Sequence, residues 1–262
     1  MGVLNITPDS FSDGGRWYRN GSLHLDTLIR QSVAMVDDGA AILDVGGEST
    51  RPGADPVSEQ EEMDRVLPVI DALARECDAV LSIDSSSARV MREAAAVGAT
   101  LLNDVRALQR PGALEAAAEL GLPVCLMHMQ GTPAHMQNNP SYEDVVDDVS
   151  AFLQERVQAC ADVGIDASRI LLDPGFGFGK TLEHNLGLLR NLNQIAALGY
   201  PLLVGLSRKS LIGKITGRDV DRRLAGSLAL AMLAARNGAS ILRVHDVAET
   251  ADVLKILSAY DA

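Results

Sequence analysis

The fold of this chain is decided by Leu171-Leu172-Asp173-Pro174-Gly175-Phe176-Gly177-Phe178-Gly179-Lys180. This stretch reads as an apolar strand that ends on a carboxylate and enters a glycine-rich turn. The pattern recurs, because short apolar segments along the chain end in one polar residue: 3–5, 42–44, 81–84, 101–103, 124–128, 170–173, 202–207 and 241–245. Amphipathic helical stretches separate most neighbouring segments. Eight such units predict an α/β fold, a closed (β/α)8 TIM barrel.

Composition supports this prediction and excludes some partners. The chain has 262 residues, of which 47% are hydrophobic and only 3% aromatic, so the core must be mainly aliphatic. Aliphatic runs suit parallel strands that are buried on both faces. The net charge of −12 argues against nucleic acid or an anionic membrane surface as a general partner. No apolar run approaches the length of a membrane span, and no leader pattern opens the chain.

The cysteines indicate a reducing compartment. Cys77, Cys125 and Cys160 are far apart in the sequence and odd in number, so we expect neither a disulfide framework nor a structural zinc site. Cys125 falls inside an apolar segment, where we expect a buried free thiol. A cytoplasmic location follows as the default expectation.

The regular spacing of helix-ending glycines and helix-capping residues predicts one domain over residues 1–262. Glycines precede several predicted strands and are expected to end the helices before them, at positions 39, 98, 121, 164 and 238. Ser58 is a candidate N-cap, with Glu61 as its capping-box partner. Two longer connections, residues 46–56 and 128–142, are expected at the end of the barrel where the strands finish, which is where barrel chemistry occurs.

Three predicted strands end in Asp84, Asn103 and Asp173, which we expect to face one cavity. Two carboxylates and an amide in one hollow are costly unless a ligand supplies hydrogen-bond donors. A flat heterocycle with an amino-pyrimidinone edge supplies such donors. The alternative is that these side chains cap helix N-termini or pair with Lys209 or Arg243.

Basic residues follow the last two strands, in Ser207-Arg208-Lys209-Ser210 and Arg243-Val244-His245. The loops after the seventh and eighth strands of such barrels commonly bind phosphate, so these residues predict an anion site. A solvated basic turn is the alternative, although it is less attractive in an acidic chain.

The glycine-rich turn matches neither common nucleotide motif. A Walker loop needs glycine where Pro174 stands, and the glycine spacing is G-x-G-x-G rather than G-x-G-x-x-G. We expect these glycines to let the backbone approach a bound ring, with Phe178 packed on its face. His128 and His135 lack a metal-ligand spacing, and we expect His135 on the surface of a loop.

Five segments carry a family resemblance over essentially the whole chain: GVLNITPDSFSDGG (2–15), DVGGESTRPG (44–53), DPGFGFGK (173–180), SRKS (207–210) and RVHD (243–246). Their sequence and order resemble the signatures of the dihydropteroate synthase family. That resemblance implies condensation of 6-hydroxymethyl-7,8-dihydropterin diphosphate with 4-aminobenzoate to form 7,8-dihydropteroate and diphosphate. It also implies a homodimer formed through barrel helices, and competition by sulfonamides, which mimic 4-aminobenzoate.

The resemblance also implies roles for individual residues. The pterin would be bound by Asp84, Asn103, Met127, Asp173, Phe178, Gly205 and Lys209. The pocket for 4-aminobenzoate would comprise Phe11, Thr50, Arg51, Pro52 and Ser207. Arg243, His245 and Asn5 would bind the diphosphate, with Asn5 also a ligand of Mg²⁺. Catalysis would depend on Asp84, Asp173, Lys209 and Arg51.

The chain departs from the family pattern in starting at the first motif and in a longer stretch around residues 16–24. We expect this stretch to lengthen the first loop or its following helix. Three other readings remain open: a corrinoid-linked methyltransferase domain, a non-enzymatic pterin-binding homologue and an aldolase-type barrel. The methyltransferase needs no diphosphate site, the non-enzymatic homologue would be expected to lose Arg51, Lys209 or His245, and the aldolase would carry its lysine within a strand.

Overall fold

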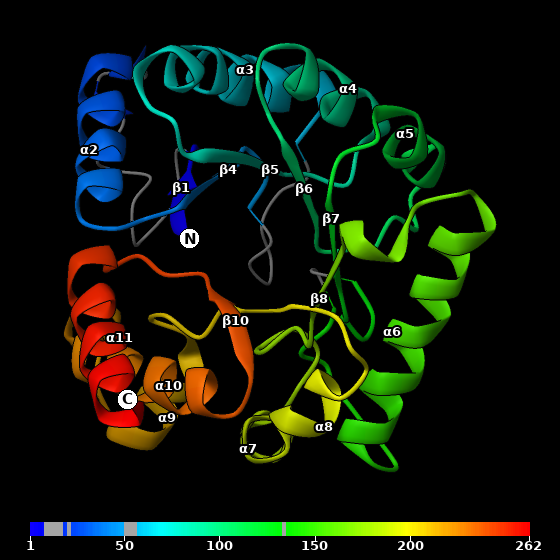
Figure 1. The fold of residues 1–262 in the computed structure, drawn as a ribbon, viewed down its shortest axis with the longest axis vertical. Helices are drawn as coiled ribbons and strands as arrows, with labels where there is room; N and C mark the ends of the chain where they lie inside the picture. The colour runs from blue at the N-terminus through cyan, green and yellow to red at the C-terminus, as the bar shows by residue number, and fades with distance from the viewer. Residues whose placement is uncertain (8–17, 20–21, 50–56, 133–134) are drawn as a thin grey trace.

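A computed structural model describes residues 1–7, 18–19, 22–49, 57–132 and 135–262. Within these residues, eight parallel strands form one sheet in the order β1-β4-β5-β6-β7-β8-β9-β10 (Figure 1). Their bounds are β1 Gly2–Asn5, β4 Ile42–Gly46, β5 Val80–Asp84, β6 Leu101–Asp104, β7 Val124–Met127, β8 Ile170–Asp173, β9 Leu202–Val204 and β10 Ala239–Leu242. The sheet follows chain order, as repeated β-α units require.

The sheet curls until its two edges meet. Gly2 in β1 forms a parallel bridge with Val244, which lies just after β10. The Val3 N–H donates to the Val244 carbonyl at 3.1 Å, and the Val244 N–H donates to the Met1 carbonyl at 2.9 Å. The predicted eight-stranded barrel is therefore confirmed. We call the end at which the strands finish the mouth.

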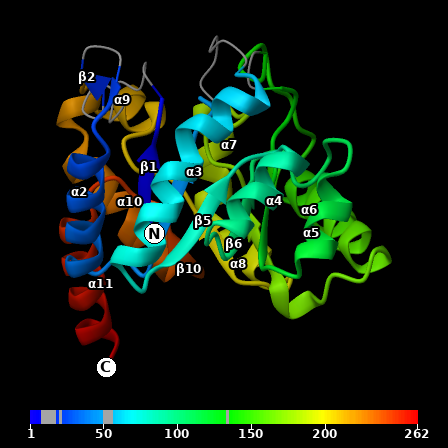
Figure 2. The same ribbon diagram turned by 90° about the horizontal axis from the view of Figure 1, so that it is seen from above.

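Helices surround the sheet in both views (Figures 1 and 2). Their bounds are α2 Leu25–Asp37, α3 Glu59–Glu76, α4 Ala88–Ala96, α5 Ala113–Leu120, α6 Val145–Asp162, α7 Leu182–Arg190, α8 Leu192–Ala196, α9 Ser210–Thr216, α10 Leu224–Arg236 and α11 Val247–Asp261. Short 3₁₀ turns cover Ala167–Arg169 and Val220–Arg222. The predicted glycine helix ends are confirmed: Gly121, for example, follows α5 with φ of 67°, a left-handed conformation that favours glycine.

One helix start differs from its prediction. The Ser58 side chain accepts a hydrogen bond from the Glu61 N–H at 3.2 Å, so the predicted N-cap of α3 is confirmed. The predicted capping box is wrong, because the Glu61 carboxylate accepts from Arg65 one turn further along the helix. Arg65 also donates to the Gly47 carbonyl at 2.7 Å, so this guanidinium joins the helix to the end of β4.

The core is aliphatic, as the composition predicts. Leu43, Ile83, Leu102 and Leu172 are fully buried strand residues, and Cys125 is a buried free thiol. All three cysteines lie in described segments and are free. No helix in the described ranges is long and apolar enough to cross a bilayer.

The strands that precede the two basic segments are shorter than predicted. β9 ends at Val204 and β10 at Leu242, so Gly205 to Ser207 and Arg243 to His245 follow the strands instead of ending them. The longer stretch near residue 20 forms a small antiparallel ribbon of β2 (Tyr18–Arg19) and β3 (Ser22–Leu23) before α2 begins. The loop after β7 reaches to the start of α6, on the mouth side as predicted.

Candidate active site

A cluster of charged and polar side chains at the mouth is centred on Arg243. Its guanidinium donates from Nε to Asp44 Oδ2 at 2.6 Å and from Nη2 to Asp84 Oδ2 at 2.9 Å. Asn103 Nδ2 donates to Asp44 Oδ2 at 3.2 Å. Asp44, Asp84 and Asn103 come from the adjacent strands β4, β5 and β6, so Arg243 binds two neighbouring strands directly and the third through Asp44.

The carboxyl of Asp84 has an unusual protonation equilibrium. Burial raises the pKa of Asp84 to about 7; the charge of Arg243 lowers this pKa, whereas Asp44 and Asp104 raise it. One guanidinium does not neutralise two adjacent carboxylates, so one of them tends to retain a proton. A carboxyl group that titrates near neutral pH is able to donate or accept a hydrogen bond.

Asp173 lies at the end of β8 and is also buried. It accepts a hydrogen bond from the Gly175 N–H at 2.7 Å. Burial raises the pKa of Asp173, while Lys209 and the Gly175 N–H lower it. Among the described residues Asp173 forms no direct ion pair, so its carboxylate lies near the Lys209 cation and is able to accept from a ligand.

Lys209 connects Asp173 to the Arg243 cluster. Its Nζ donates to the Phe176 carbonyl oxygen and lies 4.7 Å from the centroid of the Phe178 ring. Burial lowers the pKa of Lys209 to about 8, with Asp173 and Asp84 opposing this change and Arg243 adding to it. A Cβ atom at Gly205 would stand 3.8 Å from Lys209 Nζ and from Arg243 Cβ, so this glycine faces both cations.

The structure brings two further predicted residues into contact. His245 Nδ1 lies 3.0 Å from Ser207 Oγ, and the His245 N–H donates to the same oxygen at 3.2 Å. The resemblance assigned these residues to different substrates, and the structure shows that their side chains are in contact. Asn5 ends β1, beside Gly46 in the β4 register.

Four predicted site residues, Phe11, Thr50, Arg51 and Pro52, lie outside the described residues. The chain just before residue 50 is anchored at the mouth. Arg106 Nη1 donates to Glu48 Oε2 at 3.2 Å and to Ser86 Oγ at 2.9 Å. The predicted loop 46–56 is therefore held beside the end of β6 through Glu48.

Comparison with known proteins agrees with this geometry. A family model described as pterin binding enzyme matches residues 1–245. The dihydropteroate synthase of Haemophilus influenzae is 56% identical over 259 residues, which cover 99% of this chain and 92% of that protein.

Solved structures are equally similar. A Yersinia pestis dihydropteroate synthase in complex with a sulfonamide drug superposes with a TM-score of 0.96 at 52% identity, covering 100% of this chain and 93% of that one. A Xanthomonas albilineans dihydropteroate synthase with 4-aminobenzoic acid gives 0.92 at 48% identity, covering 100% and 92%. The chain belongs to the dihydropteroate synthase family of pterin-binding enzymes.

Family membership confirms the prediction made from the five motifs and excludes an aldolase-type barrel. Lys209 also stands at the N-cap of α9, outside any strand, which differs from the arrangement expected of an aldolase.

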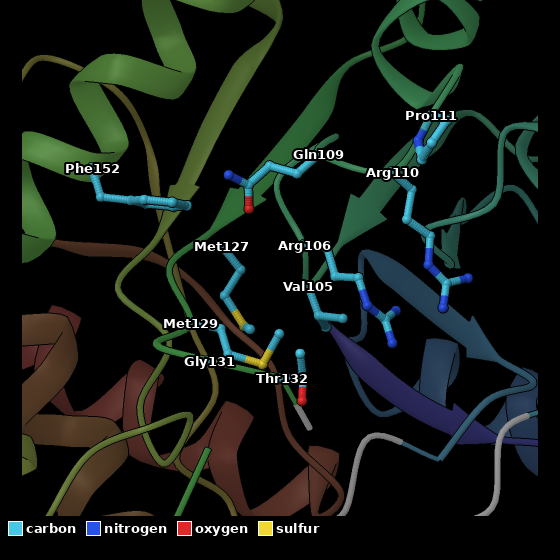
Figure 3. Close-up of a pocket in the computed structure, with 10 residues that line it drawn as sticks. All are labelled: Val105, Arg106, Gln109, Arg110, Pro111, Met127, Met129, Gly131, Thr132 and Phe152. Atoms are coloured by element: carbon cyan, nitrogen blue, oxygen red, sulfur yellow. The ribbon is translucent and has the colours of Figure 1, made fainter. Parts of the chain in front are cut away.

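Met127 lines a cavity of about 240 Å³ between the turn after β6 and the loop after β7. Figure 3 shows the Met127 and Met129 side chains beside each other, with Phe152 and Arg106 on opposite sides. The cavity is lined neither by Asp84 nor by Asp173. Met127 lies opposite Asp173 in the register of β7 and β8, so one end of the cavity adjoins the strand that carries this carboxylate.

Two residues near the site, Asp44 and Lys180, were given no role from the sequence. Asp44 ends a predicted strand, but its role depends on strand register and on the reach of Arg243. Lys180 closes the glycine-rich motif, and its ammonium lies 2.9 Å from His128 Nδ1.

His135 is exposed, as predicted, and the described residues contain no cluster of three His, Cys, Asp or Glu that would hold a metal ion.

Replacement of Arg243 with Met tests the central ion pairs. Removal of the guanidinium leaves Asp44 and Asp84 as unpaired buried carboxylates, which should cost about 3–5 kcal/mol of unfolding free energy near pH 8. The folded-state pKa of Asp84 then rises further above its unfolded value. As pH rises, this carboxyl ionises at a lower pH in the unfolded state than in the folded state, so the folded state loses stability. The loss of unfolding free energy caused by Arg243→Met should therefore be smaller at pH 5 than at pH 8.

Urea denaturation at the two pH values measures this difference. Arg75→Met is the matched control, because the Arg75–Asp71 pair is on the surface, and its stability should stay close to that of the unmodified protein at both pH values. The proposed charge balance would be contradicted if Arg243→Met lost no unfolding free energy, or if the loss were larger at pH 5 than at pH 8.

Proposed function

We propose that residues 1–262 act as one pterin-binding domain that condenses 6-hydroxymethyl-7,8-dihydropterin diphosphate with 4-aminobenzoate, in folate biosynthesis. The observation that carries this proposal is the shared position of Asp84, Asn103, Asp173 and Lys209 around Arg243. Three strands (β5, β6 and β8) and the loops after β9 and β10 contribute to this group.

The pterin fits the acceptors of this hollow. Its 2-amino group and ring N–H groups are donors, and Asp173 offers a buried carboxylate that is not engaged in an ion pair. Asp84 is able to donate or accept near neutral pH, which suits a ring with alternating donors and acceptors. Phe178 and Met127 supply apolar surfaces for its faces, and the Lys209 ammonium would bind a ring acceptor.

Departure of diphosphate is the demanding step. The bond between the pterin methylene carbon and the diphosphate oxygen breaks, and its electron pair leaves with the diphosphate. Arg243 and His245 would stabilise the charge that develops on that oxygen. Positive charge on the methylene carbon is delocalised into the pterin ring, where the Asp84 and Asp173 carboxylates favour it.

The arylamine then attacks. Its nitrogen lone pair forms the new bond to the methylene carbon, and the resulting ammonium loses a proton to solvent. Positioning matters more here than a general base, because the amine is already neutral with an available lone pair. We assign the 4-aminobenzoate pocket to Phe11, Thr50, Arg51, Pro52 and Ser207. Of these residues, Arg51 would also be needed for catalysis.

Magnesium fits the donors on this side of the mouth. Asn5 offers one amide oxygen, and Mg²⁺ is commonly bound by few protein oxygens together with substrate phosphates and water. Asn5 and the diphosphate would hold the ion, which when bound neutralises negative charge on the leaving group. The lack of a larger acidic cluster in the described ranges is compatible with such a shared site.

An apolar surface supports a homodimer. Two adjacent helices, α10 and α11, lie side by side in Figure 1 and carry exposed Met232, Leu233, Leu254, Ile256 and Tyr260. Ile256 is 70% exposed and Tyr260 74% exposed, which is unusual for such side chains in a cluster. A second copy of this chain would cover them. The three free thiols favour a cytoplasmic location.

Turnover tests the proposed reaction. The purified protein, mixed with both substrates and Mg²⁺, should release diphosphate and dihydropteroate in equal amounts, and EDTA should suppress the rate until Mg²⁺ is restored. Lys209→Ala should lower kcat/KM by about 10²–10³-fold, because a buried cation is lost from the ring site. Lys214→Ala, at an exposed position of α9, should retain normal rates. Full activity of Lys209→Ala would show that the pterin site lies elsewhere.

Sedimentation tests the dimer. The protein should sediment as a dimer, and Ile256→Asp should sediment as a monomer because a charge in the apolar contact is costly. The control is Val163→Asp, an exposed position at the end of α6. A dimer that survives Ile256→Asp unchanged would rule out this surface.

A further inference from the structure

Lys180 closes the loop 173–180, yet its ammonium is buried and has no part in the reaction proposed above. Its side chain is 2% exposed. Nζ donates to the Gly175 carbonyl at 2.9 Å and to the Phe178 carbonyl at 3.0 Å, and it lies 2.9 Å from His128 Nδ1. A buried ammonium is costly unless it is fully hydrogen-bonded, and here a fourth acceptor, the His128 carbonyl at 3.4 Å, adds to these three.

The loop is pressed against the segment that follows β7. A Cβ atom at Gly175 would stand 1.8 Å from the His128 carbonyl oxygen, and one at Gly179 would stand 2.5 Å from the Gln130 carbonyl oxygen. Only glycine allows these approaches, and both residues have positive φ. Lys180 bonds to both sides of this contact, because His128 lies on one side and Gly175 on the other.

The carbonyls bound by Lys180 flank the one that binds Lys209. Gly175 and Phe178 accept from Lys180, whereas Phe176, between them, accepts from Lys209. The Phe178 ring also lies 4.7 Å from Lys209 Nζ. The position of the Lys209 ammonium therefore depends on a backbone conformation that Lys180 holds from the inner side of the loop.

We propose that Lys180 is a positioning residue for the pterin half of the reaction: it fixes the loop 173–180 on the end of β7 and thereby places Lys209 and the Phe178 ring for the pterin. The inference rests on the proposed function, in which Lys209 and Phe178 contact that ring. Lys180 itself acts through them, because its ammonium is enclosed by backbone carbonyls and His128.

Lys180→Met tests this role, since methionine fills a similar volume and cannot donate. The kcat/KM for the pterin diphosphate should fall by about 100-fold, as expected when a binding group is misplaced by about 1 Å. The KM for the pterin diphosphate should rise, and the KM for 4-aminobenzoate at saturating pterin diphosphate should stay unchanged. Lys214→Met is the matched control and should behave as the unmodified protein.

The pH profile of activity is a second readout, because it reports the surroundings of the Lys209 ammonium, where loss of the Lys180 charge and exposure to water both raise the pKa of Lys209. Burial lowers the pKa of Lys209 to about 8, so activity that needs the charged ammonium falls above that pH. Release of the loop admits water to Lys209 and moves its pKa towards the ordinary 10.5. The alkaline limb of the profile should therefore shift to higher pH in Lys180→Met.

Lys180→Gln decides the question if the methionine variant does not fold, because its amide still donates to one carbonyl. It should fold and show the same selective rise in KM for the pterin diphosphate. Folded variants with normal KM and pH profile would overturn the proposal, as would failure of both variants to fold, which would assign Lys180 to stability alone. Lys209→Ala, assayed in parallel, separates the role of Lys180 from the proposed function. Full activity of Lys209→Ala would show that the pterin site is wrongly assigned, independently of the result for Lys180.

Discussion

The mouth of this barrel depends on one shared cation. Arg243 donates to Asp44 and Asp84, whose strands lie side by side, and Asn103 joins the same group through Asp44. Without the guanidinium, two buried carboxylates would face each other in a space that excludes much of the water. The ion pairs therefore allow acidic groups to gather where the strands converge, and these groups form the charged wall of the proposed pterin site.

The opposite side of the proposed pterin site is built from backbone groups. There the glycine-rich loop turns its carbonyls towards two lysines, Lys180 inside the loop and Lys209 at the site. Glycine at positions 175 and 179 is required by the close approach of two backbone segments, whereas glycine at 205 faces Arg243 and Lys209. The site thus combines a rigid charged wall with a loop whose conformation is set by hydrogen bonds.

Much of this arrangement could be predicted from the sequence, for identifiable reasons. Strand ends of a parallel barrel meet at one end, so Asp84, Asn103 and Asp173 were expected together. Pairing of Asp44 with Arg243 joins residues far apart in the chain and depends on the strand register, which no local pattern encodes. The Glu61 capping box failed because Arg65 competes for the same carboxylate. Lys180 closes a motif that reads as a loop, and its burial becomes visible only when the loop meets the end of β7.

The charge balance around Arg243 is most directly tested by following the carboxyl carbons of the aspartates by ¹³C NMR as a function of pH, with Asp84→Asn to assign the signal. Asp84 should titrate near pH 7, because burial and Asp44 oppose its ionisation. An Asp84 carboxyl that titrates near its ordinary value of 3.8 would contradict this charge balance.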